Sequence, residues 1–301
     1  MKVGAVYPQI ELDGDPEGVD RIGRATEALG YDHIVFYDHV VGAVHEGRNP
    51  PLWERGPYTD KDPFHDPFVV FGYLAGITKK IDFVSGILIL PQRQTVLVAK
   101  QATDVDLLSG GRLKLGVGTG WNYVEYDALG QSFAKRGERM TEQIGFLRRL
   151  WSEPLVTFKG KYDAIDRGNI IPRPRHQIPI LCGGFAEPAY KRAAKLGDGF
   201  IFAASVENGA LPGWARVKAL LGESGRPVEG FRAQHIVQSD RGSGLDVRAA
   251  IDSVRRWADA GGSHASIVTM GLGYKTIDQH IDHLARVRDG LKAAEIGDFV
   301  N

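Results

Sequence analysis

Short apolar segments rich in β-branched residues alternate with longer amphipathic segments along most of the chain. The first unit runs from an expected strand at 3–7, through a helix capped by Asp15 and ended by Gly30, to a second strand at 32–37. The expected strands, each followed by a helix, cover residues 3–7, 32–37, 81–90, 112–117, 178–182, 200–203, 232–238 and 265–270. Eight such units predict a (β/α)8 TIM barrel, an α/β fold, because each strand needs helical cover on one side only and the last can pair with the first. An open doubly wound sheet is the alternative.

Two segments interrupt this alternation within what we expect to be a single domain spanning residues 1–301. Residues 40–66 form a long loop rich in prolines, aromatic residues and cations, and we expect an ordered lid over the barrel mouth. A dimer contact would draw on the same residues and stays open. Residues 152–177 are polar and proline-rich, which indicates an insertion with a small hairpin near 158–165.

Composition limits the classes of function. The chain carries 37 basic and 37 acidic side chains, and this zero net charge argues against nucleic acid binding, which needs a cationic surface, so we expect a small-molecule partner. The single cysteine, Cys182, excludes an intrachain disulfide and a cysteine-based zinc cluster, which favours a reducing, cytoplasmic location. The start of the chain enters a strand directly and no apolar run of 18 residues occurs, so neither secretion nor a membrane span is expected.

In TIM barrels the active site lies at the carboxyl ends of the strands. The second expected strand ends in Asp38 and His39, and His39 is the best candidate for proton transfer because histidine exchanges protons near neutral pH. Asp38 could fix the tautomer of this histidine or order the loop that follows. A purely structural hydrogen bond of His39 is the alternative.

Glycine-rich corners follow two later strands. The three glycines within 116–120 resemble a dinucleotide fingerprint only weakly, because residues 121–135 read as a polar aromatic loop where that motif needs a helix. They nevertheless allow backbone amides to approach a flat or anionic ligand. The glycine pair 183–184 precedes a helix that starts near Ala186, which indicates a phosphate cradle, with a simple tight turn as the alternative.

The sequence supports no metal site. Its nine histidines are scattered, and His280 and His283, which share one face of the last expected helix, are expected to face solvent rather than bind a metal. A serine hydrolase is also unsupported, because no Gly-x-Ser-x-Gly motif occurs.

Several segments, taken in order, resemble the luciferase-like monooxygenase superfamily and, more closely, its branch of probable oxidoreductases that use coenzyme F-420, a deazaflavin. The matching stretches are Glu27–Asp32 leading to Asp38–His39, Leu88–Arg93, Ala99–Thr103, Leu108–Leu113 with Gly116–Trp121, and Pro179–Gly184 leading to Ala193–Gly199. Beyond about residue 205, only the barrel pattern supports the resemblance.

The resemblance implies a barrel, usually dimeric, that holds coenzyme F-420, or alternatively FMN, in its mouth with the ring against the third strand. It implies a bulge with a cis peptide bond at Gly86–Ile87 under the ring, and His39 beside the reactive face as proton donor or base. The pyrimidine end, tail and phosphate would lie along the fourth and fifth strands. The cofactor-binding residues expected on this basis are Ser85, Gly86, Ile87, Gln92, Gly118, Thr119, Gly120, Trp121, Gly183, Gly184, Phe185 and Ala186.

One position departs from the pattern of some deazaflavin-dependent sugar-phosphate dehydrogenases of this superfamily. In those proteins a glutamate follows the glycine loop as proton donor, whereas this chain has Trp121 there, and Glu125 is the nearest carboxylate. No sugar phosphate is therefore assigned as substrate. The expected catalytic residues are His39, Asp38 and Glu125, and the role of acid stays open between His39 and Glu125.

The expected function is hydride transfer between F-420 and a small, partly apolar organic substrate. The lid side chains expected to contact that substrate are Trp53, Tyr58, Phe64 and His65. An FMN-dependent monooxygenase that uses oxygen and a partner reductase is the alternative. A non-catalytic subunit, which binds the cofactor or has only a structural role, is the second alternative.

Overall fold

Parallel strands pair edge to edge into one closed sheet in the computed structural model, which describes residues 1–52, 56 and 58–299. The strands of this sheet are β1 (Lys2–Val6), β2 (His33–Phe36), β3 (Asp82–Ser85), β4 (Leu88–Ile89), β5 (Leu113–Gly118), β8 (Ile180–Gly183), β9 (Gly199–Phe202), β10 (Arg232–Val237) and β11 (His264–Ile267). Their order is β3-β2-β1-β11-β10-β9-β8-β5-β4, and pairing of β3 with β5 closes the circle. Since β3 and β4 are consecutive pieces of one strand, the barrel has eight strand positions, which confirms the predicted single-domain (β/α)8 fold.

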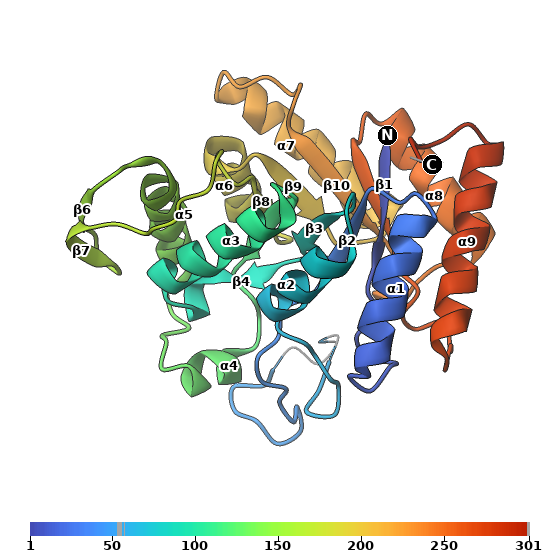
Figure 1. Ribbon diagram of the computed structural model, residues 1–301, viewed down its shortest axis with the longest axis horizontal. Helices are drawn as coiled ribbons and strands as arrows, with labels where there is room; N and C mark the ends of the chain where they lie inside the picture. The colour runs from blue at the N-terminus through green and yellow to red at the C-terminus, as the bar shows by residue number, and fades with distance from the viewer. Residues whose placement is uncertain (53–55, 57, 300–301) are drawn as a thin grey trace.

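Helices surround the outer face of this barrel (Figure 1). They are α1 (Pro16–Ala28), α2 (Pro67–Ile77), α3 (Thr95–Ser109), α5 (Arg136–Ser152), α6 (Glu187–Leu196), α7 (Leu211–Glu223), α8 (Val247–Asp259) and α9 (Ile277–Ala293). The predicted cap of α1 is confirmed, because the Asp15 side chain accepts a hydrogen bond of 2.9 Å from the backbone N–H of Glu17. The π-helical turn η2 (Val206–Ala210) precedes α7.

The third barrel strand is interrupted between β3 and β4. The Gly86–Ile87 peptide bond in this gap is cis, as the resemblance predicts. β4 then runs directly into the short 3-10 turn η1 (Leu90–Gln92), which leads to α3. The interruption therefore lies at the carboxyl end of the barrel, where the candidate site is expected.

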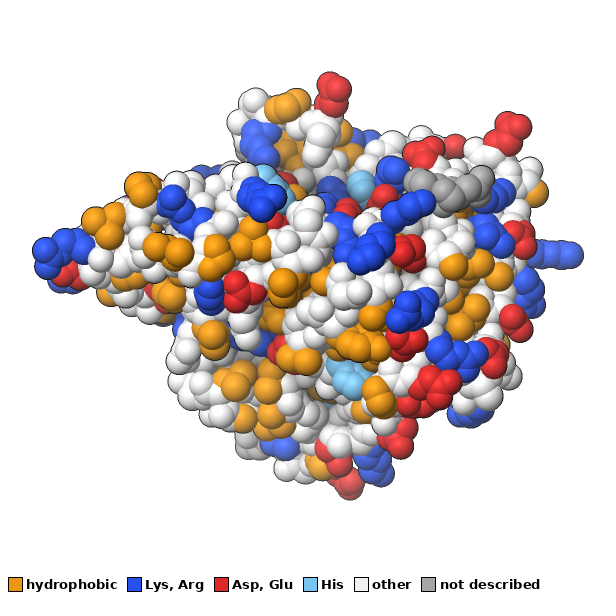
Figure 2. Space-filling model, viewed as in Figure 1, with side chains coloured by type: hydrophobic (Ala, Val, Ile, Leu, Met, Phe, Trp, Pro, Cys, Tyr) orange, Lys and Arg blue, Asp and Glu red, His pale blue; other side chains and the backbone are white. Residues whose placement is uncertain are grey.

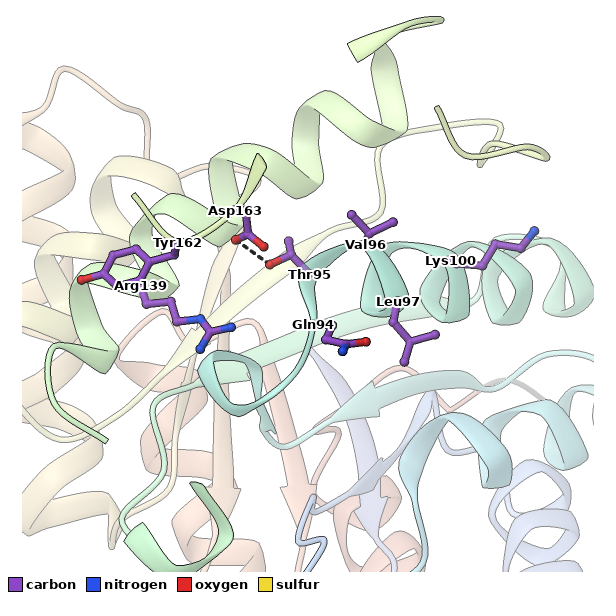
Figure 3. A pocket seen from close by; sticks show the side chains of 8 residues that line it. All are labelled: Gln94, Thr95, Val96, Leu97, Lys100, Arg139, Tyr162 and Asp163. Carbon is purple, nitrogen blue, oxygen red and sulfur yellow. Dashed lines mark hydrogen bonds between the residues drawn. The ribbon is translucent and has the colours of Figure 1, made fainter. Parts of the chain in front are cut away.

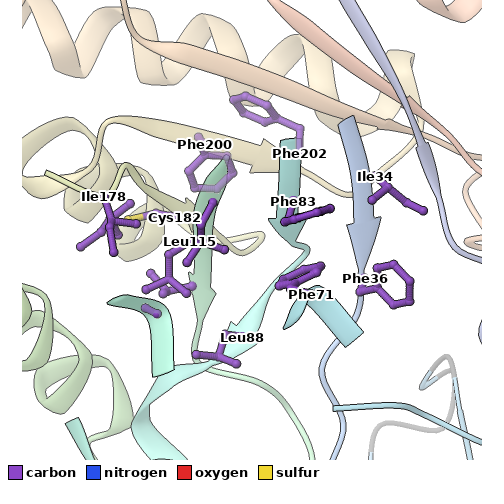
Figure 4. Packing of buried hydrophobic residues seen from close by; sticks show 14 of the residues in the cluster. Ile34, Phe36, Phe71, Phe83, Leu88, Leu115, Ile178, Cys182, Phe200 and Phe202 are labelled. Carbon is purple, nitrogen blue, oxygen red and sulfur yellow. The ribbon is translucent and has the colours of Figure 1, made fainter. Parts of the chain in front are cut away.

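The main core lies between the barrel and its helices (Figure 4). Phe71 of α2 stacks on Phe83 of β3 with ring centroids 5.4 Å apart, and it meets Phe36 of β2 edge-on at 5.7 Å. Cys182 is buried in the same core, and burial raises the pKa of its thiol to about 12. The thiol is therefore a packing group rather than a reactive one.

A second, smaller core fills the barrel itself. Its fully buried layer consists of Val6, Val35, Val84, Leu181, Ile201, Ile236 and Val268, with Met270 above them. Half-buried Ile10, Tyr37, Ile87 and Ala203 pack on this layer. These four side chains thus form a partly exposed apolar surface at the mouth, above the buried layer inside the barrel.

The two interrupting segments differ in structure. Within residues 40–66, the described residues form neither helix nor strand. The insertion at 152–177 contains the antiparallel hairpin of β6 (Val156–Lys159) and β7 (Ala164–Gly168), which projects from the barrel beside α5 (Figure 1). The expectation of a loop at 121–135 is wrong in part, because the helix α4 (Tyr123–Ala128) forms there.

The expectation that His280 and His283 face solvent is also wrong, since both side chains are buried. His280 Nδ1 lies 2.8 Å from Thr269 Oγ1, and His283 Nδ1 lies 3.0 Å from the Tyr274 hydroxyl. The segment after β11 folds back over this face of α9 and supplies these partners. Burial lowers the pKa of each histidine to about 4, so both are neutral at pH 7.

The described residues contain no helix long and apolar enough to cross a membrane. They also contain no group of three or more histidine, cysteine or acidic side chains placed to hold a metal ion.

Candidate active site

Asp38, two residues after β2, is buried, and it binds residues at the end of strand three rather than His39. Its carboxylate accepts hydrogen bonds from Arg93 Nη2 at 2.6 Å and from the backbone N–H of Ile89 at 2.8 Å. Arg93 also binds Asp66, the residue that caps α2, at 3.1 Å. Burial lowers the pKa of Arg93, but the two carboxylates raise it more, so the guanidinium stays charged. Because Asp38 and Asp66 flank the lid, Arg93 anchors both of its ends.

His39 points instead toward Glu125 of α4. The distance between His39 Nδ1 and Glu125 Oε2 is 3.4 Å, and the side chains are 12% and 0% exposed. A carboxylate only accepts, so this contact selects the tautomer that carries its proton on Nδ1. Nε2 has no hydrogen-bond partner among the described residues. The tautomer-fixing role considered for Asp38 therefore falls to Glu125.

The Glu125 carboxylate is fully occupied by groups of the protein. Oε1 accepts from the backbone N–H groups of Val40 at 2.7 Å and Val41 at 3.2 Å. Oε2 accepts from the Tyr58 hydroxyl at 2.9 Å, besides its contact with His39. A carboxylate bound by this many donors is a positioning group, which leaves His39 as the better placed proton donor of the two.

Aromatic rings from the lid and from the loop after β5 enclose His39. Its ring centroid lies 3.5 Å from that of Tyr58, 4.8 Å from Phe64 and 6.5 Å from Trp121. His65 is not part of this group, since its ring lies against Tyr7 at 6.5 Å. Trp53 falls outside the described residues. The structure thus brings two of the lid residues expected to contact substrate to the candidate catalytic histidine.

The predicted cofactor platform is apolar and rests on glycines. A side chain at Gly118 or at Gly183 would place its Cβ 2.6 Å from a carbon of Ile87, so Ile87 can lie in this position only because both residues are glycine. Ser85 is not free to bind a ligand, because its hydroxyl donates to the carbonyl of Gly116 at 2.8 Å. Gln92 is 2% exposed, and neither atom of its amide has a partner among the described residues.

Two of the remaining predicted residues, Thr119 and Gly120, lie in the loop after β5. Thr119 uses its backbone carbonyl to accept from the Tyr126 hydroxyl at 2.7 Å. Gly120 has a positive φ of 61° and faces Ile89. Gly120 therefore brings the loop after β5 close to strand three.

The predicted phosphate cradle lies between β8 and α6. Ala186 caps α6 without a side-chain hydrogen bond, and Pro188 in the first turn has no N–H. Glu187 is paired with Arg216 at 2.7 Å. Free backbone amides are thus confined to residues 184–187, and Phe185 projects into solvent with 65% of its surface exposed.

Two cavities lie near the carboxyl ends of the strands. One of about 310 Å³ borders the phosphate cradle and includes Gly184 and Phe185 in its wall. The other, of about 540 Å³, lies outside the barrel between the start of α3, α5 and the hairpin (Figure 3). None of the residues predicted to bind cofactor or substrate lines this second cavity.

Arg93 and Asn122 organise the site, although neither was predicted from the sequence to do so. Asn122 caps α4 through a hydrogen bond of 3.0 Å from the N–H of Val124, and its amide donates to the Tyr58 hydroxyl at 3.1 Å. Asn122 followed three residues later by Glu125 resembles a capping box, and this signal would have placed a helix here.

We expect Glu125→Gln to lower the free energy of unfolding by about 1–3 kcal/mol. The amide nitrogen of the new side chain is a donor, and it would face other donors, such as the Tyr58 hydroxyl and His39 Nδ1–H, where the carboxylate now accepts. Urea unfolding measures this loss, and limited trypsin cleavage at Arg48 and Lys61 reports release of the lid. Glu46→Gln, an exposed lid substitution, is the matched control. Equal stability and equal cleavage of both variants would show that the Glu125 contacts do not hold the lid.

Comparison with known proteins identifies the family of this chain. The sequence model of the luciferase-like monooxygenase family matches residues 4–274 of this chain. The uncharacterized protein Rv0940c of Mycobacterium tuberculosis is 33% identical over 244 residues, covering 80% of this chain and 81% of that protein. Pyrimidine monooxygenase RutA of Allorhizobium ampelinum is 31% identical over 175 residues, which are 55% of this chain and 47% of RutA.

Solved structures share the fold at low sequence identity. Monooxygenase RslO1 from Streptomyces bottropensis superposes with a TM-score of 0.79 at 15% identity, covering 98% of this chain and all of that one (100%). An F420-dependent secondary alcohol dehydrogenase with an F420-acetone adduct gives 0.73 at 16% identity over 95% and 97% of the chains. The oxygenating constituent of 3,6-diketocamphane monooxygenase from Pseudomonas putida, in complex with FMN, gives 0.74 at 13% identity over 98% and 99%. By the family match over most of its length, this chain belongs to the luciferase-like monooxygenase family.

Proposed function

We propose that this protein is an oxidoreductase that transfers a hydride between coenzyme F-420 and a small organic substrate. The observation that carries the proposal is the position of His39 after β2, where Glu125 holds Nδ1 and Nε2 has no hydrogen-bond partner among the described residues. The mouth beside it has the apolar floor of Ile10, Tyr37, Ile87 and Ala203, which suits a planar ring. A protonatable group beside an apolar platform is what hydride transfer to or from a polar substrate requires.

The residues present fit a flavin or deazaflavin. Ile87 would support the ring from below, and the corner 118–121 would approach its edge through backbone groups. The amides of residues 184–187 would bind the phosphate, and the buried, unpartnered amide of Gln92 adds a further polar group at the end of strand three. When bound, such a cofactor accepts or supplies the hydride.

In this proposal the protein's own side chains transfer the proton and exclude bulk water. His39 Nε2 receives a proton from a substrate hydroxyl in one direction and returns it in the other, while Glu125 stabilises the charged imidazolium through Nδ1–H. Tyr58, Phe64 and Trp121 cover the histidine and keep bulk water away from it. Arg93 holds the two ends of the lid in place through Asp38 and Asp66.

An FMN-dependent monooxygenase is the second candidate. The sequence relative RutA is named a pyrimidine monooxygenase, and the structural neighbours include an FMN complex as well as an F-420 complex. In a monooxygenase reaction the same platform would hold FMN, and the reaction would need oxygen and a partner reductase. The two candidates share His39 and differ in the cofactor.

Cofactor titration separates the candidates. We expect purified protein to bind F-420 more tightly than FMN. The fluorescence of each cofactor measures its binding. Gly183→Ala should weaken that binding at least tenfold, because the added Cβ would displace Ile87 toward the ring site. Gly145→Ala in α5, where no atom lies within 4 Å of the added Cβ, is the control. Binding of FMN alone would favour the monooxygenase, and binding of neither would end both proposals.

His39→Ala should lower turnover by about 10²- to 10⁴-fold while leaving cofactor affinity near that of the parent protein. The measurement is kcat with the bound cofactor across a panel of alcohols, enones and imines. Unchanged turnover in this variant would refute the role of His39. Cofactor binding without turnover in the parent protein would instead favour the non-catalytic alternative.

We further propose a homodimer formed through α2 and α3. α2 has no charged residue between Pro67 and Ile77, yet Val69 is 72% exposed, and Leu97 of α3 is 51% exposed. Figure 2 shows hydrophobic side chains on the face where these helices lie. Exposed apolar surface of this kind favours association with a second copy.

Sedimentation velocity tests the dimer. We expect the parent protein to sediment as a dimer and the double variant Val69→Asp with Leu97→Asp to sediment as a monomer. Val228→Asp introduces the same charge at a half-exposed apolar position outside α2 and α3, and it should remain dimeric. A monomeric parent protein would disprove the interface.

A further inference from the structure

Two side-chain donors share one oxygen of the Glu125 carboxylate. The Tyr58 hydroxyl donates to Oε2 at 2.9 Å, and His39 Nδ1 lies 3.4 Å from the same atom. The contact of Tyr58 is the shorter of the two, and that of His39 is at the long end of hydrogen-bond distances. The other oxygen, Oε1, accepts from the backbone N–H groups of Val40 and Val41. Tyr58 and His39 therefore compete for the negative charge on a single oxygen.

The Tyr58 hydroxyl is held in the orientation of a donor to Glu125. The side-chain amide of Asn122 donates to the Tyr58 oxygen at 3.1 Å, and a carboxylate can only accept, so the hydroxyl proton goes to Oε2. Burial and the neighbouring Glu125 raise the pKa of Tyr58, so the hydroxyl keeps its proton at neutral pH. The three side chains thus form a hydrogen-bonded series that runs from Asn122 through Tyr58 to Glu125.

This series is shielded from water. Tyr58, Asn122 and Glu125 are all buried. The rings of Phe64 and Trp121 each pack on Tyr58 with centroids 5.1 Å apart. Charges and dipoles interact more strongly in such surroundings than at an exposed surface, because little water screens them. A single hydrogen bond to Oε2 therefore affects the free energy of a charge on the neighbouring imidazole.

The direction of this effect follows from the dipole of the Tyr58 O–H group. Its positive end lies at Oε2 and offsets part of the carboxylate charge. The imidazolium form of His39 is stabilised by that same charge, since the two are opposite in sign and in contact. The hydrogen bond from Tyr58 therefore makes the protonated form of His39 less stable than it would be beside Glu125 alone.

The other charged groups near His39 do not depend on Tyr58. Asp38 is its neighbour in the chain, and the Asp38 carboxylate is paired with Arg93 at 2.6 Å, so these opposite charges partly offset each other at the imidazole. The His45 ring packs on Trp121, with centroids 5.5 Å apart. Because all of these groups remain when the Tyr58 hydroxyl is removed, a comparison of variants isolates that hydroxyl.

We infer that Tyr58 is a positioning residue for His39, which weakens the hold of the imidazole on its proton by donating to the same oxygen of Glu125. The inference rests on the proposed function for its consequence, because only a histidine that exchanges protons with a substrate makes use of the effect. In that reaction a less firmly held proton leaves His39 more readily when a substrate oxygen receives it. Asn122 acts one step further away, by fixing the direction of the Tyr58 O–H group.

NMR titration of the full chain with isotope-labelled histidine, and with no cofactor added, tests the inference. The His39 signal is identified by its loss in His39→Ala. We expect Tyr58→Phe to raise the midpoint of the His39 titration by about 0.5–1 pH unit, because the new side chain no longer donates to Oε2. The matched control is Tyr123→Phe, which removes a hydroxyl of α4 that donates to the carbonyl of Pro50 at 2.8 Å. This control should leave the midpoint unchanged.

A second variant separates this electrostatic role from a loss of packing. Glu125→Gln removes the charge that stabilises the imidazolium, so it should lower the midpoint, which is the opposite of the change expected for Tyr58→Phe. Adding Tyr58→Phe to Glu125→Gln should then have little further effect, because the two act through the same oxygen. General loosening of the site would not give changes of opposite sign.

An unchanged or lowered midpoint in Tyr58→Phe would overturn the inference, and so would equal changes in Tyr58→Phe and Tyr123→Phe. Since the titration uses no cofactor, its result does not depend on the redox function. A raised midpoint in a protein that turns over no substrate with F-420 or FMN would support the inference about the hydrogen bonds and refute the proposed function. Turnover by the parent protein with an unchanged midpoint in Tyr58→Phe would support the function and overturn the inference.

Discussion

The arrangement of side chains at the mouth of this barrel depends on the hydrogen bonds that the buried carboxylate of Glu125 accepts. It accepts from the backbone after β2, from Tyr58 of the lid and from His39, and it lies on α4, so a single group connects these segments. A carboxylate removed from water needs such donors, because an unsatisfied buried charge is strongly destabilising. The same contacts that stabilise Glu125 therefore hold the lid and orient the histidine.

Arg93 complements this arrangement from the other side. By binding Asp38 and Asp66, it joins the two ends of the lid to the end of strand three. The lid is thus fixed at its ends by an ion-pair network and in its middle by Tyr58. Together these contacts place aromatic side chains around His39, and its Nε2 has no hydrogen-bond partner among the described residues, as the proposed proton transfer requires.

The barrel fold and most helix boundaries could be predicted from local patterns. The cap at Asp15, the hairpin near Phe158 and the β-α alternation all appear in the structure where the sequence indicates them. α4 was missed because six residues are too few for a clear helical period. The burial of His280 and His283 was missed because the segment around Tyr274, which covers them, contributes no periodic signal of its own.

The sequence by itself determined the fold class, the strand ends at which polar residues gather, and the glycines that make close packing at Ile87 possible. These properties depend on neighbours along the chain, through periodicity, capping and the size of a side chain. Only the tertiary structure decided that Glu125, rather than the adjacent Asp38, contacts His39 across 86 positions of sequence. Closure of the barrel brings α4 and the end of β2 together, and no local pattern encodes which carboxylate that closure places beside the imidazole.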